Sequence, residues 1–245
     1  MVTTIGTIIR GNRDVFPPYL YEAYRSTVKR APGMPLVDVP LTLSEMTGPG
    51  PVISAVTPED ADLTTNAGTG GEAIGQRIIV TGRVLDERGA PVPKTLVEVW
   101  QANAAGRYIH RSDQWPGPLD PNFLGIGRCL TDEAGVYRFL TIRPGAYPWK
   151  NHPNAWRPAH IHFSLFGPST VSRLITQMYF PDDPLHALDP IFNSVPTEEG
   201  RRRLIATYAH DVTQPEWALG WRWDIVLRGA QATPFEAQTQ QEGAR

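Results

Sequence analysis

The sequence predicts a mainly-β protein, a β-sandwich of mixed and antiparallel strands with long loops and an irregular N-terminal extension. Two observations lead to this fold class. Short apolar, β-branched segments recur between turn residues along residues 76–230, which is typical of a sandwich. The 245 residues also include 22 glycines and 24 prolines. Because proline removes a backbone donor and interrupts helices, this composition favours short strands joined by turns.

Residues 1–75 show little periodicity and are expected to form the N-terminal extension. Prolines interrupt the segment repeatedly, although residues 19–29 could form a short helix. Tyr19, Tyr21, Tyr24 and the apolar residues of 36–43 favour burial. We therefore expect this extension to wrap over the core or over a partner chain.

The strands are expected in residues 76–230, which form the main domain. The first is Arg77–Leu85, bounded by a turn at residues 86–89. In residues 95–101, Leu96, Glu98 and Trp100 alternate with valines, as in a strand with two different faces. Residues 127–130 and 135–142 predict a hairpin around the turn 131–135. Further strands are expected at 159–166, 174–180 and 221–227, the last of which closes the sheet.

One helix is expected, over residues 197–210. Thr197 is a good N-cap, and Glu198 and Glu199 would lie in the first turn, where negative charge is favourable. Residues 231–245 form a polar C-terminal tail that we expect to fray.

Charge and cysteine content exclude several function classes. The formal net charge is −2, from 23 basic and 25 acidic residues, so there is no electrostatic reason to expect nucleic acid or an anionic membrane as a partner. Cys129 is the sole cysteine, so no internal disulfide can form and a cytoplasmic location is expected. The sequence predicts neither a signal peptide nor a membrane span.

The most informative motif is the pair His160 and His162. Residues i and i+2 of a strand share one face, so both imidazoles can point at the same ion. Tyr147 lies just upstream in a proline-flanked turn, and Tyr108 follows Gly106-Arg107. Phenolate is a hard anionic ligand suited to a highly charged ion. Two histidines with two tyrosines therefore suggest ferric iron.

Other metal sites fit the motif less well. A cupin-type His-x-His site would carry a glutamate a few residues later, and none follows here. A zinc hydrolase would offer a third histidine or a carboxylate at comparable spacing. His152 is the one close additional histidine, in a polar loop, whereas His110, His186 and His210 are expected at the surface.

The chain resembles the intradiol ring-cleaving dioxygenases, and within them the iron-bearing β chain of the two-chain enzymes that act on protocatechuate. Six segments carry the resemblance: residues 98–108, 119–123, 127–132, 143–149, 156–163 and 224–229. The ligand order Tyr, Tyr, His-x-His is specific to this family, and its homologous α chains lack these ligands.

The resemblance implies a non-haem Fe(III), one per chain, held by Tyr108, Tyr147, His160 and His162. A trivalent cation lowers the pKa of a bound phenol, so both tyrosines can bind as phenolates. Their charges offset most of the charge of the ion and favour ferric over ferrous iron.

Further residue roles follow from the same resemblance. Tyr147 leaves the iron when substrate binds and takes up a proton. Arg157 stabilises negative charge on the substrate, and Gln177 supports Arg157 by hydrogen bonding. Four residues are expected to line the substrate pocket, with plain core packing as the alternative: Tyr24, Trp100, Trp149 and Ile191. Lys150 either steers an anionic substrate or is a solvated loop residue.

The implied reaction is cleavage of protocatechuate by O2 to 3-carboxy-cis,cis-muconate in the breakdown of aromatic acids. The implied partner is a homologous α chain that completes the active site in an αβ hetero-oligomer. The sequence lacks the long N-terminal helical segment of catechol 1,2-dioxygenases. Two alternatives stay open: an intradiol enzyme for catechol or hydroxyquinol, and a non-catalytic β-sandwich module that binds metal.

Overall fold

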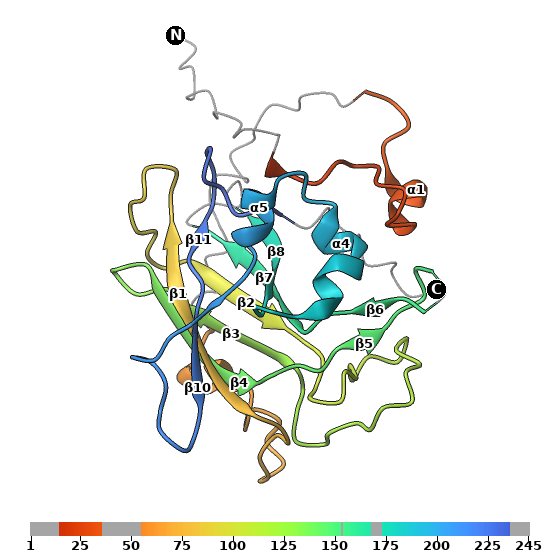
Figure 1. Cartoon of the computed structure of the whole chain (residues 1–245). Helices are drawn as coiled ribbons and strands as arrows, with labels where there is room; N and C mark the ends of the chain where they lie inside the picture. The colour runs from red at the N-terminus through yellow and green to blue at the C-terminus, as the bar shows by residue number, and fades with distance from the viewer. Residues whose placement is uncertain (1–14, 36–54, 153, 168–172, 236–245) are drawn as a thin grey trace.

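The computed structural model describes residues 15–35, 55–152, 154–167 and 173–235. Two main sheets pack against each other (Figure 1), which confirms the predicted sandwich. One is built around β1 (Arg77–Leu85), and the other has the strand order β3-β2-β7-β8. A separate two-stranded ribbon pairs β5 (Tyr147–Pro148) with β6 (Trp156–Arg157). In Figure 1 this ribbon lies on the opposite side of the view from β1.

In the first sheet, β1 is the central strand and its bounds match the prediction. It pairs antiparallel with β4 (Val136–Ile142) and parallel with β10 (Leu219–Arg222) and β11 (Ile225–Val226). The short β9 (Thr207–Tyr208) pairs with β10. The closing strand expected at 221–227 is therefore present but divided into two parts.

Trp223 explains the division between β10 and β11. Its carbonyl accepts a hydrogen bond of 2.6 Å from the hydroxyl of Tyr137. The same carbonyl lies where a Cβ on Gly82 would stand. The chain can approach β1 this closely only because residue 82 is glycine.

In the second sheet, β2 (Leu96–Trp100) pairs with β3 (Ile126–Leu130) and β7 (His160–Phe166), and β7 pairs with β8 (Leu174–Tyr179). The predicted hairpin is wrong, because β3 pairs with β2 whereas β4 pairs with β1. The hydroxyl of Thr131 gives the physical reason. It donates to the carbonyl of Val92 and accepts from the amide of Thr95, which ties the end of β3 to the segment that enters β2.

The core lies between the inner faces of the two sheets. Phe163 on β7 contacts three aromatic rings of the other side, with ring centroids 5.8 Å from Tyr137, 5.8 Å from Phe139 and 4.9 Å from Trp223. Since aromatic side chains bury large areas, this cluster joins the two sheets into one unit. The inner face of β7 is thus held by the core, and this also fixes the backbone that carries His160 and His162.

The helices are short. They are α1 (Ser26–Arg30), η2 (Pro58–Ala61), η4 (Pro184–Leu188), α4 (Pro190–Asn193) and α5 (Glu198–Arg202). No helix among the described residues combines the length and apolarity that a membrane crossing requires.

The helix expected over 197–210 is wrong in extent. The side chain of Thr197 does cap α5 by accepting from the amide of Gly200. The helix ends at Arg202, however, because the next residues pair with the sheet edge. Tyr179 donates its amide to Leu204 and accepts from the amide of Ala206. The helix considered possible over residues 19–29 is also shorter than expected and begins later in the chain, as α1.

The N-terminal extension packs on the sandwich in its described parts. Leu63 is fully buried and donates its amide to the carbonyl of Leu140 on β4. Tyr24 is also buried, whereas Tyr19 is exposed and Tyr21 half-buried. The expectations for residues 36–43 and for the end of the C-terminal tail lie outside the described residues.

Candidate metal centre

The two histidines project from β7 toward one point. Register places His160 opposite Tyr179 and His162 opposite Gln177 on β8, and Trp100 opposite His162 on β2. The Nε2 atoms of His160 and His162 are 3.2 Å apart, and both residues are buried. Trp100 stacks on His162 with the ring planes 4° apart and centroids 4.7 Å apart. The second imidazole is therefore held by packing.

Hydrogen bonding selects the tautomer of His160. Its Nδ1 lies 2.7 Å from the carbonyl oxygen of Pro158, and a carbonyl can only accept, so Nδ1 carries the proton. Burial, with the charges of Arg157 and His162, holds the pKa of His160 well below its usual value. A neutral imidazole that carries its proton on Nδ1 presents Nε2 as a donor atom, which is what a metal requires of a histidine ligand.

Tyr147 reaches the same point from β5. Its hydroxyl oxygen is 3.3 Å from Nε2 of His160. Two donors bound at about 2.0–2.1 Å to one ion, at right angles to each other, lie about 3 Å apart. The contacts that His160 makes with His162 and with Tyr147 match that separation, so these residues fit a shared metal ion.

Tyr108 joins from the long loop after β2. Its ring meets that of Tyr147 edge-on, with centroids 5.3 Å apart. The Asp113 carboxylate holds the loop by accepting from the amide of Tyr108 at 2.8 Å. Asn103 connects this loop to the Tyr147 turn, because its side chain accepts from the amide of Arg107 and its carbonyl from the amide of Gly145.

Burial raises the pKa of Tyr147, and the neighbouring Arg157 and Tyr108 oppose the rise only in part. The phenol is therefore the favoured form until a cation offsets its negative charge.

Arg157 is the charged centre of the site and is 2% exposed. Its Nη1 donates to Nε2 of His160 at 2.9 Å and lies 3.4 Å from the hydroxyl of Tyr147. Its Nη2 donates to Oε1 of Gln177 at 2.6 Å. The predicted support of Arg157 by Gln177 is thus present as a direct contact.

Asp189 is a candidate site residue that the sequence did not reveal. Its carboxylate pairs with Nη2 of Arg157 at 2.9 Å, with both side chains almost fully buried. Burial alone would lower the pKa of Arg157, but Asp189 reverses this and the pKa lies well above its usual value. Tyr179 completes the cluster through its hydroxyl, 2.9 Å from the same Nη2. A buried guanidinium requires a carboxylate, yet the sequence does not reveal one 32 positions away.

The expected pocket residues border this cluster. The ring of Trp149 lies 5.6 Å from the guanidinium of Arg157, and the ring of Tyr24 is 5.5 Å from that of Trp149. Ile191 lines a pocket together with Tyr24 and Gln177. All the predicted site residues thus form one connected region.

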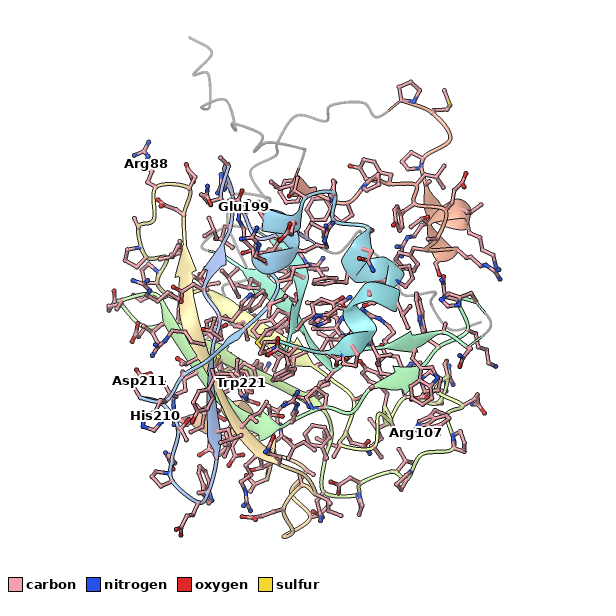
Figure 2. All side chains as sticks on the ribbon, viewed as in Figure 1. Arg88, Arg107, Glu199, His210, Asp211 and Trp221 are labelled. Atoms are coloured by element: carbon pink, nitrogen blue, oxygen red, sulfur yellow. The ribbon has the colours of Figure 1, made fainter. Side chains whose placement is uncertain are left out.

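The remaining histidines lie elsewhere, with one correction. His110 and His210 are exposed as expected, and Figure 2 shows His210 beside Asp211 across the molecule from Arg107 in the Tyr108 loop. His186 corrects that expectation only in part, because it is half-buried and its ring stacks on Phe192 with the centroids 4.8 Å apart. His152 is half-buried in the loop between β5 and β6, and Lys150 is exposed there.

The sandwich thus brings two phenols, two imidazoles and a buried arginine to one site, the combination that the resemblance to the intradiol dioxygenases predicts. The family model described as "Dioxygenase" matches residues 48–229, and the model for the protocatechuate 3,4-dioxygenase beta subunit N terminal matches residues 9–42. The chain belongs to the intradiol ring-cleavage dioxygenase family, whose members use non-haem iron. This confirms the family membership predicted from the motifs.

Individual relatives indicate which members of the family the chain resembles. The protocatechuate 3,4-dioxygenase beta chain of Burkholderia cepacia is 60% identical over 220 residues, which span 90% of this chain and 93% of the relative. The alpha chain from Pseudomonas putida is 30% identical over 67% of this chain and 77% of its own length. The crystal structure of 3-chlorocatechol 1,2-dioxygenase from Rhodococcus opacus 1CP has a TM-score of 0.52 and 26% identity, covering 70% of this chain and 65% of that one.

Proposed function

We propose that the chain is the iron-bearing β subunit of an enzyme that cleaves protocatechuate with O2 to 3-carboxy-cis,cis-muconate. The observation that carries the proposal is the convergence of the Tyr147 hydroxyl with Nε2 of His160 and His162, beside a buried arginine. The similarity to a protocatechuate 3,4-dioxygenase beta chain over 90% of the chain supports the choice of substrate.

The proposed ligands are Tyr108, Tyr147, His160 and His162, holding one Fe(III) per chain. Two phenolates offset two of the three positive charges, which makes burial of the ion less costly. Among the described residues there is no group of three His, Cys, Asp or Glu side chains suited to a metal, so the site depends on its phenols. Bound ferric iron supplies a Lewis acid that acidifies the catechol hydroxyls and activates the ring toward O2.

The residues of the chain supply proton transfer and charge stabilisation. Since burial favours the protonated form of Tyr147, its phenolate oxygen is suited to accept a proton from a substrate hydroxyl. Arg157, fixed by Asp189 and Gln177, presents a permanent positive charge where negative charge develops on the substrate. Its preorganisation by buried partners means that little rearrangement is needed during the reaction.

The pocket and its partner chain belong to the same proposal. Trp100, Trp149, Ile191 and Tyr24 would wall the substrate, and a homologous α chain would complete the site in an αβ hetero-oligomer. Residues 1–75 would form the extension that wraps the core or this partner, 76–230 the catalytic domain, and 231–245 a tail. A cytoplasmic location, which the single cysteine favours, is also part of it.

The rival functions are an intradiol enzyme for catechol or hydroxyquinol and a non-catalytic metal-binding module. The test uses the full chain co-produced with the α chain and supplied with iron. A red-brown tyrosinate charge-transfer band that shifts on anaerobic addition of protocatechuate, together with O2 consumption, is the expected result. Faster turnover of catechol or hydroxyquinol would reassign the substrate. A colourless protein would favour the binding module.

The ligand assignment has its own test. His162→Ala removes one imidazole and should lose most of the iron, measured by metal analysis of the purified protein. Asn122→Ala is the control that should keep its iron, because the side chain of Asn122 lies in a loop and bonds to Thr69 and Glu72. A full iron complement in His162→Ala would exclude this ligand set.

A further inference from the structure

Asn151 fastens the N-terminal arm, residues 15–35, to the loop between β5 and β6. Its Oδ1 accepts from the amide of Arg25 at 2.8 Å, and its Nδ2 donates to the carbonyl of Ala23 at 2.9 Å. The two segments are more than 120 positions apart, and Asn151 is 4% exposed. One amide therefore uses its donor and its acceptor to hold a single stretch of distant backbone.

The residue between these two bonds is Tyr24. Because Asn151 binds the backbone on either side, it fixes the direction in which the side chain of Tyr24 leaves the arm. The ring of Tyr24 packs against that of Trp149 with the centroids 5.5 Å apart, and the guanidinium carbon of Arg30 lies 4.6 Å from the centroid of the Tyr24 ring. Tyr24 is itself buried, at 4% exposure.

Tyr24 belongs to the region next to the reacting groups. It lines the same pocket as Gln177, Tyr179 and Ile191, and Trp149 connects it to Arg157. The oxygen and the nitrogen of the Asn151 side-chain amide both bind the backbone of the arm rather than a side chain of the metal centre. Its side chain can thus act on the pocket wall through the arm that carries Tyr24.

We propose that Asn151 is a positioning residue for substrate recognition, which fixes Tyr24 where its ring lines the pocket and packs against Trp149. The inference rests on the proposed function. Loss of the clamp releases the arm and weakens substrate binding, whereas the ligands and Arg157 keep their own contacts. The expected kinetic result is a change in KM with little change in kcat.

The experiment uses the full chain with its α chain and iron. In Asn151→Ala, KM for protocatechuate should rise about tenfold, while kcat stays within about twofold and the resting visible band is unchanged. Asn151→Asp keeps the acceptor for Arg25 and loses the donor to Ala23, so its KM should lie between wild type and Asn151→Ala. Asn122→Ala is the matched control, because Asn122 also bridges distant loop segments, to Thr69 and Glu72; its KM should stay at the wild-type value.

A double-mutant cycle separates positioning from general stability. If Asn151 acts through Tyr24, then Asn151→Ala in a Tyr24→Ala background should raise KM by less than about twofold further. A wild-type KM in both Asn151 variants, a fall in kcat at constant KM, or additive effects with Tyr24→Ala would overturn the inference. Failure of the wild type to cleave protocatechuate would instead contradict the proposed function, and the same cycle would then be run with the catechol that it does cleave.

Discussion

Tyr147 combines two properties that conflict in water, because it is buried and is proposed to bind as an anion. Burial raises its pKa, so only a nearby cation makes the phenolate favourable. Tyr147→Phe should keep iron on the three remaining ligands. It should also alter the visible charge-transfer band and lower kcat about 100-fold, since a proton acceptor is lost. Metal analysis, absorption spectra and steady-state rates check this, and an unchanged spectrum and rate would remove Tyr147 from the site.

Asp189 carries the opposite charge that keeps Arg157 buried. Asp189→Asn leaves the guanidinium without its carboxylate at a site almost closed to solvent. The free energy of unfolding should fall by about 3–5 kcal/mol, and kcat should fall as Arg157 loses its fixed direction. Urea unfolding and steady-state kinetics measure the two effects.

The control for Asp189 is Asp211→Asn. Asp211 pairs with Arg222 at 2.7 Å in an exposed ion pair, and exposed pairs contribute little to stability. Equal destabilisation by both substitutions would mean that the pair of Arg157 and Asp189 has no special role in the site.

At the residue scale, the sequence predicts the proposed ligands but not all the partners of Arg157. The shared face of His160 and His162 follows from strand periodicity alone. The two tyrosines follow from their place near this motif and from phenolate chemistry, and the family resemblance supplied the role of Arg157. Asp189 and Tyr179 are joined to Arg157 by folding rather than by spacing. Asp189 does precede Pro190 as the cap of α4, which marks it as a helix start but not as the partner of an arginine.

At the scale of elements, the Tyr108 loop and the Tyr147 turn depend on a close approach of backbones. Gly106 has a φ of +74°, and a Cβ there would lie 2.2 Å from the carbonyl oxygen of Ala146. Gly106→Ala should therefore push the two tyrosine segments apart and reduce both the iron content and the visible band.

Gly89→Ala is the control for that substitution. Gly89 has a φ of +79° with no atom near its absent Cβ, so it bears the left-handed strain, about 1–2 kcal/mol, without a clash. Iron content and thermal unfolding of both variants check the comparison. Equal iron in the two would show that separation of the tyrosine segments is tolerated.

The strands and helices could be predicted where the local sequence pattern determines them, and not where pairing with distant strands does. The apolar, β-branched run of β1 fixed its bounds, and Thr197 correctly marked a helix start. The supposed hairpin of 127–142 failed because a turn does not specify whether its strands pair or separate into two sheets. The helix after Thr197 was overestimated because residues 204–206 bind the backbone of Tyr179, a tertiary competition that helical propensity does not include.

At the scale of the whole molecule, the site is assembled from parts that the sandwich alone would not hold together. β7 supplies the histidines, the ribbon of β5 and β6 supplies Tyr147 and Arg157, and the N-terminal arm adds Tyr24 through Asn151. The rigid core aligns the imidazoles, whereas loops and the arm shape the pocket. Under the proposed function, this division would let substrate binding change without loss of the metal ligands.

The integrity of the sandwich can be followed through Cys129, the sole cysteine of the chain. Cys129 lies on β3, is 8% exposed, and burial raises its pKa to about 12. At pH 8 the thiolate fraction is therefore roughly 10⁻⁴, and the thiolate is the reactive form. The folded enzyme should react with a disulfide reagent such as DTNB only at the rate at which β3 opens. In 6 M guanidinium chloride, about 1 mol thiol per mol chain should react at once, since the unfolded thiol has an ordinary pKa. Rapid reaction of the folded protein at pH 8 would show that this side of the second sheet opens independently of the core.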